Sequence, residues 1–200
     1  MDVPEILVVA YLPDYPRNDR DYNAHATFGD CNDVTCTGTI GSLTPICEPA
    51  MPGLYFEEFS VGQTFDHPIH RTITETDNVL LTTMTHNPAA LHLDAEYMKG
   101  TLFGRPLVNS CLTLSFMVGI SVNDTTNGTT VANLGFDEVT FPKPLFCGDT
   151  IHVQTEVLEL RDSKSRPDNG IVIFAHRAFN QNGDLVGECK RSALMLRAPK

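Results

Sequence analysis

The segment PLVNSCLTLSFMVGISV, residues 106–122, constrains the fold most, because it predicts a helix with apolar side chains on every side. Pro106 suits the first position of such a helix, where an amide hydrogen would have no intrahelical partner. A helix of this kind needs other structure around it, since water would otherwise contact its apolar side chains. Four small residues leave part of its surface thin enough for close approach of a backbone or a ligand: Ser110, Cys111, Ser115 and Gly119.

Three later stretches predict a sheet that could surround this helix. Residues 151–157 alternate in part between apolar and polar side chains, and residues 171–179 and 185–196 are long and rich in β-formers. The sequence Gln-Asn-Gly-Asp at 181–184 suits the turn of a hairpin. We therefore expect an α+β fold, in which an antiparallel sheet wraps around one central buried helix.

Residues 1–52 differ in texture from the rest of the chain. They hold several of its 13 prolines together with many Asp, Asn and Thr residues, and no periodic pattern runs through them. A chain of 200 residues fits one domain with an appendage. We therefore predict a poorly ordered N-terminal extension over residues 1–52, in which residues 6–11 could form a short strand, and a single domain over residues 53–200.

Charge and hydropathy limit the partners. The net charge is −11, and 14 Lys and Arg residues form no dense basic stripe, which argues against binding to nucleic acid. The longest apolar run, residues 6–12, is too short to cross a bilayer, and the acidic start lacks the basic residues of a leader peptide. We expect a cytoplasmic protein that does not associate with membranes.

The six cysteines include no CxxC pair. In a cytoplasmic protein this spacing predicts free thiols and no metal site. The alternative is a zinc site formed by Cys31, Cys36, Cys47 and His25.

Two stretches resemble the MaoC-like dehydratase family. LHLDAEYMKGTLFGRPLVNS, residues 91–110, has a histidine two residues before an acid and the pattern FG-x-P before the apolar helix. FPKPLFCGDTIHVQTEV, residues 141–157, matches F-x-x-P-L-x-x-G-D-T at the start of a strand. The likeness covers residues 54–198, and RPLVNS and SKSRP are similar to the subgroup of itaconyl-CoA and mesaconyl-CoA hydratases. It implies a hotdog fold, a homodimer or an assembly of dimers, and hydration or dehydration of thioester-linked acyl chains.

His92 is the candidate proton carrier. The family motif D-x-N-P-x-H pairs an Asp with the His, and counting back from His92 without a gap puts Asn87 in the place of that Asp. With a gap, Asn87 and Pro88 match the motif's Asn-Pro and Thr85 takes the acidic position, so neither alignment supplies a carboxylate. Because imidazole titrates near pH ~6.5, we expect His92 to move both protons, alone or with His86, and Asn87 to orient the water. The alternatives are a packed core histidine and an Asn that only forms an Asx turn.

The resemblance also implies an oxyanion donor at the start of the apolar helix. The backbone N–H of Ser110 occupies that place, and Asn109 stands where the family has a His. Free amides and the helix dipole at a helix N-terminus both favour negative charge.

Cations suggest how a substrate could be held. Arg105, in the turn before the helix, could clamp a second carboxylate, or could cap the carbonyls of the preceding loop. Lys143, Lys164 and Arg166 are candidates for the phosphates of coenzyme A, although lysines and arginines on surface loops are usually only solvated.

The leading prediction is a hydro-lyase that reversibly hydrates a short enoyl-CoA, with a five-carbon dicarboxylic acyl group of the mesaconyl or itaconyl type favoured. Coenzyme A enters as part of the substrate, and no other cofactor is expected. The alternatives are a broader (R)-specific enoyl-CoA hydratase and a catalytically silent protein that binds acyl-CoA. One sheet around one helix leaves an edge and a face uncovered, which predicts closure by a second copy of the chain.

Overall fold

A computed structural model describes residues 53–199 of the chain. The predicted extension over residues 1–52, its strand at residues 6–11 and the alternative zinc site all lie outside the described residues. Within the described part, helices come first and long strands follow, as the sequence predicted.

The elements fall into two groups along the chain. The first group is short: the 3₁₀ turn η1 (Phe56–Glu58), strands β1 (Thr64–Asp66) and β2 (Arg71–Thr72), and helices α1 (Glu75–Met84), α2 (Ala90–Leu93) and α3 (Ala95–Lys99). The second group is long: helix α4 (Ser110–Thr125) and strands β3 (Thr130–Thr140), β4 (Thr150–Asp162), β5 (Asn169–Phe179) and β6 (Leu185–Leu196).

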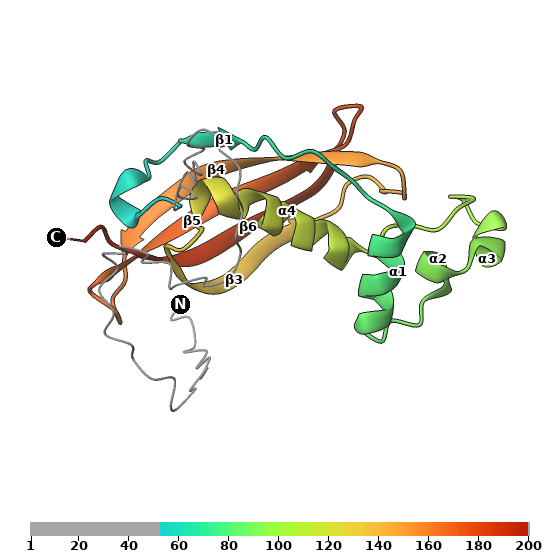
Figure 1. Cartoon of the computed structure of the whole chain (residues 1–200), viewed down its shortest axis with the longest axis horizontal. Helices are drawn as coiled ribbons and strands as arrows, with labels where there is room; N and C mark the ends of the chain where they lie inside the picture. The colour runs from blue at the N-terminus through green and yellow to red at the C-terminus, as the bar shows by residue number, and fades with distance from the viewer. Residues whose placement is uncertain (1–52, 200) are drawn as a thin grey trace, which may run out of the picture. The chain divides into compact units, whose positions relative to one another are not determined.

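The strands form an antiparallel sheet in the order β1-β4-β5-β6-β3, with β2 also paired to β4 (Figure 1). The β5–β6 hairpin is closed by Asn180 N–H, which donates to the Asp184 oxygen over 3.0 Å. Gly183 in its turn has φ 78°, a conformation that glycine adopts without steric cost. The predicted α+β architecture and this hairpin are therefore confirmed.

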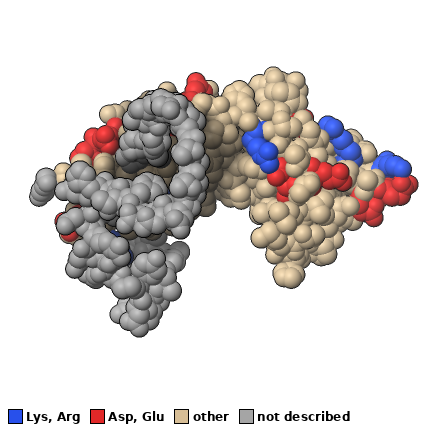
Figure 2. Space-filling model, viewed as in Figure 1, with Lys and Arg blue, Asp and Glu red and all other residues tan. Residues whose placement is uncertain are grey.

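Charged side chains of the described part are intermixed. Arg177 on β5 donates to Glu156 on β4 over 2.9 Å and to Glu188 on β6 over 2.8 Å. On the face shown in Figure 2, basic side chains likewise lie beside acidic ones. Partly exposed pairs at a sheet surface contribute about 1 kcal/mol or less each, so backbone hydrogen bonds between the strands and the apolar core hold the sheet together.

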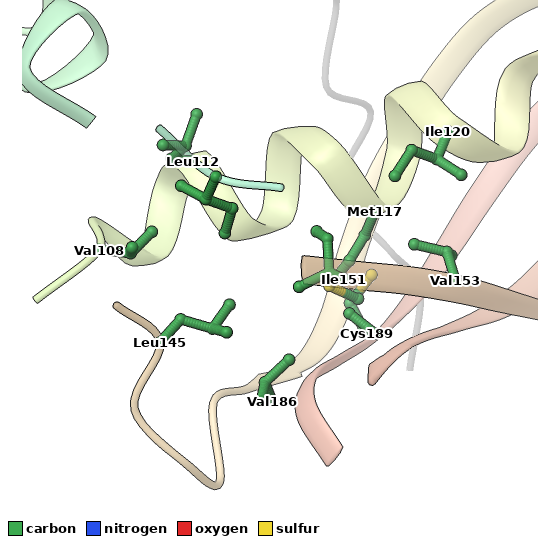
Figure 3. Packing of buried hydrophobic residues seen from close by; sticks show 11 residues of the cluster. Val108, Leu112, Met117, Ile120, Leu145, Ile151, Val153, Val186 and Cys189 are labelled. Carbon is green, nitrogen blue, oxygen red and sulfur yellow. The ribbon is translucent and has the colours of Figure 1, made fainter. Parts of the chain in front are cut away.

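The core lies between α4 and the sheet. Leu112, Met117 and Ile120 on α4 are buried in one cluster with Val153 on β4 and Cys189 on β6 (Figure 3). Full burial of an aliphatic side chain contributes about 1.5–3 kcal/mol, so this contact fixes α4 on the sheet.

Helix α4 begins at Ser110 and not at Pro106, where the sequence predicted its start. The preceding segment is extended because Val108 N–H donates to the Leu145 oxygen over 2.9 Å. Asn109 is the N-cap, and its side-chain oxygen accepts a hydrogen bond from the amide two residues later at 2.9 Å. Pairing with a segment distant in sequence thus overrides the local preference of proline for the first helical position.

Among residues 53–199 of one chain, only one side of α4 is covered. The exposed side carries the small residues Cys111, Ser115 and Gly119. The enclosure on every side that the sequence predicted is therefore not reached by the described residues of a single chain. No helix between residues 53 and 199 combines the length and the apolarity needed to cross a lipid bilayer.

Helix α1 starts with a capping box. Asp77 N–H donates to Thr74 Oγ1 over 3.1 Å, and Thr74 N–H donates to the Asp77 carboxylate over 2.8 Å. These hydrogen bonds from Thr74, with a smaller effect of Arg71, lower the pKa of Asp77. The box fixes the start of α1, and therefore the direction in which Glu75 and Asn78 project.

A buried row of polar side chains ties the end of α4 to the sheet. His67 contacts the Asp124 carboxylate on α4 through Nδ1 and Thr155 on β4 through Nε2, each at 2.8 Å. Thr155 Oγ1 also lies 2.8 Å from Nδ1 of His176 on β5. The row lies in the core, so its histidines are structural side chains.

Candidate active site

One hydrogen bond fixes the ring of His92 on α2. Leu107 N–H donates to the Leu91 oxygen over 2.9 Å, which brings the residues before α4 alongside α2. The Leu107 oxygen lies 2.9 Å from Nδ1 of His92, and because a carbonyl can only accept, Nδ1 carries the proton of the neutral ring. The Nε2 atom therefore keeps a lone pair, which a general base needs.

Asn78 on α1 holds this arrangement together, although no sequence motif pointed to it. Its side-chain nitrogen donates to the His92 oxygen over 3.2 Å and to the Leu107 oxygen over 3.1 Å. Its side-chain oxygen accepts from Asn109 N–H at 2.8 Å. The side chain is 1% exposed. The available signal was the amide side chain itself, which lies beside Val79 on α1. A side-chain amide that becomes buried must find hydrogen-bond partners, which marks Asn78 as a residue that joins segments.

A cavity of about 220 Å³ opens beside His92. Its polar lining comes from Glu75, Asn78, His92, Arg105 and Cys147. The guanidinium carbon of Arg105 lies 3.8 Å from the centre of the Phe146 ring, and this stacking contact limits the movement of the Arg105 side chain. Burial, and then the charge of Glu75, raise the pKa of the Cys147 thiol, which keeps it protonated. No group of three or more His, Cys, Asp or Glu residues within 53–199 is arranged to hold a metal ion.

A second cavity, of about 330 Å³, opens at the N-terminus of α4. Ser110, Thr113 and Lys143 line it together with apolar side chains such as Phe141. Among residues 53–199, no acceptor contacts the Ser110 amide, whereas the next three amides of α4 donate to the N-cap residue. Ser110 N–H is therefore available to a ligand. Lys143, by contrast, is already paired with the Asp184 carboxylate.

Two of the predicted residues are occupied with structural tasks. The side-chain oxygen of Asn87 accepts from Ala89 N–H at 3.0 Å, which is the Asx turn given above as the alternative. Asn87 lines neither of the two cavities. Asn109 is 5% exposed and uses its amide, its side-chain oxygen and its side-chain nitrogen inside the protein, so it is a cap and does not face a ligand.

A single chain does not bring all the predicted residues together. His92 and Arg105 line the smaller cavity, and Ser110 lines the larger one. Lys164 and Arg166 lie in the β4–β5 loop, at the end of the sheet next to the C-terminus of α4, whereas His92 lies beyond the other end (Figure 1). The loop is far from the site because β4 and β5 run the length of α4.

An antiparallel sheet folded over one long helix, with a histidine-lined cavity beyond the start of that helix, defines a hotdog-fold protein. The family model described as MaoC like domain matches residues 57–173. The chain belongs to the MaoC-like domain family, as the sequence motifs indicated.

Curated relatives are about 30% identical to the chain over the residues that align. A beta-methylmalyl-CoA dehydratase from Chloroflexus aurantiacus is 31% identical over 137 residues, which cover 68% of this chain and 38% of that protein. A mesaconyl-CoA hydratase from Cereibacter sphaeroides is 28% identical over 134 residues, covering 67% of this chain and 38% of that protein. The chain thus spans less than half the length of these relatives.

Solved structures support the same fold over most of the described part. A monoamine oxidase regulatory protein from Archaeoglobus fulgidus is 32% identical with a TM-score of 0.68, covering 75% of this chain and 99% of that one. The R-hydratase PhaJ1 from Pseudomonas aeruginosa is 26% identical with a TM-score of 0.61, covering 74% of this chain and 88% of that one.

Proposed function

We propose that the chain is a hydro-lyase that reversibly hydrates an enoyl-CoA thioester. The observation that carries the proposal is His92, whose Nδ1 hydrogen bond to the Leu107 oxygen leaves Nε2 free as a base at a cavity. Membership of the MaoC-like family and relatives named as CoA-thioester hydratases and dehydratases support it. Positioned proton transfer of this kind contributes about 10²–10⁴-fold to rate.

In the forward direction, Nε2 of His92 accepts a proton from water while the water oxygen bonds to Cβ of the thioester. The electron pair of the double bond moves toward Cα and the thioester oxygen, where an enolate forms. The imidazolium then returns the proton to Cα, so the ring is neutral again at the end. The Ser110 amide is the proposed donor to the enolate oxygen. This role requires the thioester to extend along residues 105–110, which contribute to both cavities.

For the acyl group, we propose a five-carbon dicarboxylic chain. Arg105 lines the same cavity as His92, and it has no carboxylate partner among residues 53–199. Its stacking on Phe146 leaves the edge of the guanidinium free for a distal carboxylate. Relatives named for mesaconyl-CoA support this choice over a broad hydratase for unbranched chains.

The test measures the hydration of mesaconyl-CoA, itaconyl-CoA and crotonyl-CoA by the purified protein, monitored as the loss of enoyl absorbance. We expect turnover with preference for a dicarboxylic thioester, and Arg105→Gln should reduce that preference. A strong preference for crotonyl-CoA would remove the clamp but leave the hydratase. Thioester binding without turnover, unchanged in His92→Ala, would instead indicate a silent acyl-CoA-binding protein.

We also propose that two copies assemble through β3. This strand is at one edge of the sheet, and it exposes the apolar side chains Val131, Leu134, Phe136 and Val139. An unpaired apolar edge is a template for strand pairing, and a second copy would cover it. In such an assembly Lys164 and Arg166 could act on a coenzyme A bound by the other copy, which they cannot do within one chain.

A further inference from the structure

We propose that Glu75, the first residue of α1, is the carboxylate that orients the reacting water beside His92. This inference rests on the hydration proposed above and adds a residue to it. Neither alignment of the family motif supplies an acid near His92, and the oxygen of Asn87 is occupied by its Asx turn at 3.0 Å. Glu75 fills this gap from a different element.

The geometry of α1 turns Glu75 toward the His92 cavity. Residues three and four apart lie on one face of a helix, so Glu75 shares a face with Asn78 and Val79. Asn78 on that face donates to the His92 oxygen over 3.2 Å, which fixes the face against α2. All three residues of the face line the cavity together with His92.

Glu75 is also free to bind a ligand. No hydrogen bond or ion pair within residues 53–199 engages its carboxylate. Its negative charge acts inside the cavity, because it contributes to the raised pKa of the Cys147 thiol, which lines the same cavity. Arg105, another lining residue, has the opposite effect on the pKa of this thiol, so both charges act on the same part of the cavity.

The neighbouring acids do not compete for this role. Asp77 is held by Thr74 and Arg71, at 2.7 and 2.8 Å. Asp94 caps α3 by accepting from the Tyr97 amide at 2.9 Å. The cavity lining includes neither of these aspartates.

The two side chains divide the work on one water molecule. One O–H of the water donates to Nε2 of His92 and the other to the Glu75 carboxylate, which turns a lone pair of the oxygen toward Cβ. As the O–Cβ bond forms, His92 takes the first proton and passes it to Cα. Glu75 keeps the second hydrogen bond throughout and remains ionised, so it positions the water and exchanges no proton.

The experiment compares Glu75→Gln and Glu75→Asp with the wild-type chain on the enoyl-CoA that the wild type hydrates. Glu96→Gln is the matched control, because Glu96 is exposed on α3 and pairs only with Lys99. We expect Glu75→Gln to lower kcat about 10- to 100-fold with KM within about twofold, since a water-orienting contact acts in the transition state. Glu75→Asp should recover part of that loss, and the control should match the wild type.

A second measurement separates positioning from a structural role. The melting temperatures of Glu75→Gln and Glu75→Asp should stay close to that of the wild type, because no hydrogen bond or ion pair within residues 53–199 engages this carboxylate. A fall in melting temperature together with kcat would assign Glu75 a structural role and overturn the inference. A wild-type kcat in Glu75→Gln, with activity still lost in His92→Ala, would also overturn it and leave the proposed function standing. A change in KM alone would also overturn it, because Glu75 would then affect substrate binding through Arg105 and not the reacting water. No hydration by the wild type would overturn both proposals.

Discussion

The side-chain amide of Asn78 donates to the backbone oxygen of His92 over 3.2 Å, so a buried residue of α1 fixes the position of the His92 backbone in α2. The same amide binds Leu107 O, which in turn accepts from the ring of His92. The ring and its backbone are therefore fixed by one set of hydrogen bonds, centred on a side chain that does not carry out the chemistry.

Replacing this amide should affect stability and activity together. Asn78→Ala leaves two carbonyl oxygens and the Asn109 amide without their partner in a buried place, at a cost of about 1–3 kcal/mol in the free energy of unfolding. We expect kcat to fall as well, because His92 loses its fixed position. Urea unfolding and steady-state hydration rates measure both effects. Asn123→Ala, at an exposed position of α4, is the control, and equal effects of the two variants would show that Asn78 has no special role.

His92 itself is the sharpest test of the proposed chemistry. His92→Ala should lower turnover at least about a hundredfold while circular dichroism and the melting temperature stay close to wild type. His86→Asn is the matched control, because His86 is exposed, lines neither cavity and has φ 54°, a conformation that asparagine tolerates. Nearly normal turnover in His92→Ala would remove the imidazole from the mechanism.

How far the sequence predicted the structure depends on the range of the contacts involved. The hairpin at residues 181–184 rests on neighbouring residues, and it was predicted correctly. The start of α4 was wrong, because the extended path of Val108 comes from a partner far along the chain. Local patterns encode turns and caps, whereas strand pairing between distant segments does not show in them.

The same distinction applies to the candidate site. His92 was identified because its motif is continuous in sequence. Asn78, which donates to the His92 oxygen, and Glu75, which lines the same cavity, were missed because α1 meets α2 only in the folded chain. Lys164 and Arg166 were grouped with His92 on charge alone, and the length of β4 and β5 separates them within one chain.

Asn87 distinguishes between the two alignments of the family motif. Asn87→Asp preserves an oxygen that can accept from Ala89 N–H, so the Asx turn and the fold should survive. We expect activity close to that of the wild type, because Asn87 lines neither cavity and its side-chain oxygen is held in the Asx turn. Activity raised well above the wild type would instead place position 87 at the reacting water, as in the gap-free alignment. Hydration rates and a thermal melt measure this. Complete loss of activity in a normally folded variant would refute that placement.

The exposed edge of the sheet predicts a dimer that one charge can disrupt. Leu134 on β3 is 47% exposed, and Leu134→Lys would put an ammonium group into an apolar contact between two β3 strands. We expect light scattering after size exclusion to give a dimer for the wild type and a shift toward monomer for the variant. Leu102→Lys is the control, because Leu102 is 94% exposed in a loop. A monomeric wild type, or a variant that stays dimeric, would contradict assembly through β3.

The buried histidine row makes the fold sensitive to mild acid. Burial, with the nearby Arg191 and His67, lowers the pKa of His176 to about 3 from its ordinary 6.5. Between these two pH values the imidazole is protonated in the unfolded chain but not in the native chain. The free energy of unfolding therefore falls as the pH drops from 6.5 toward 3, on the order of a few kcal/mol in total. The stabilising effect of ionised Asp77 is lost only below about pH 4, the ordinary range in which an aspartate takes up a proton. Urea unfolding at pH 7.5 and 5.0 therefore measures the contribution of the histidine.

The variant His176→Asn, which can still bond to Thr155, should show a smaller loss of unfolding free energy between the two pH values than the wild type. His152→Asn, at a partly exposed position of β4, should not, and an equal loss in all three proteins would assign the acid sensitivity elsewhere.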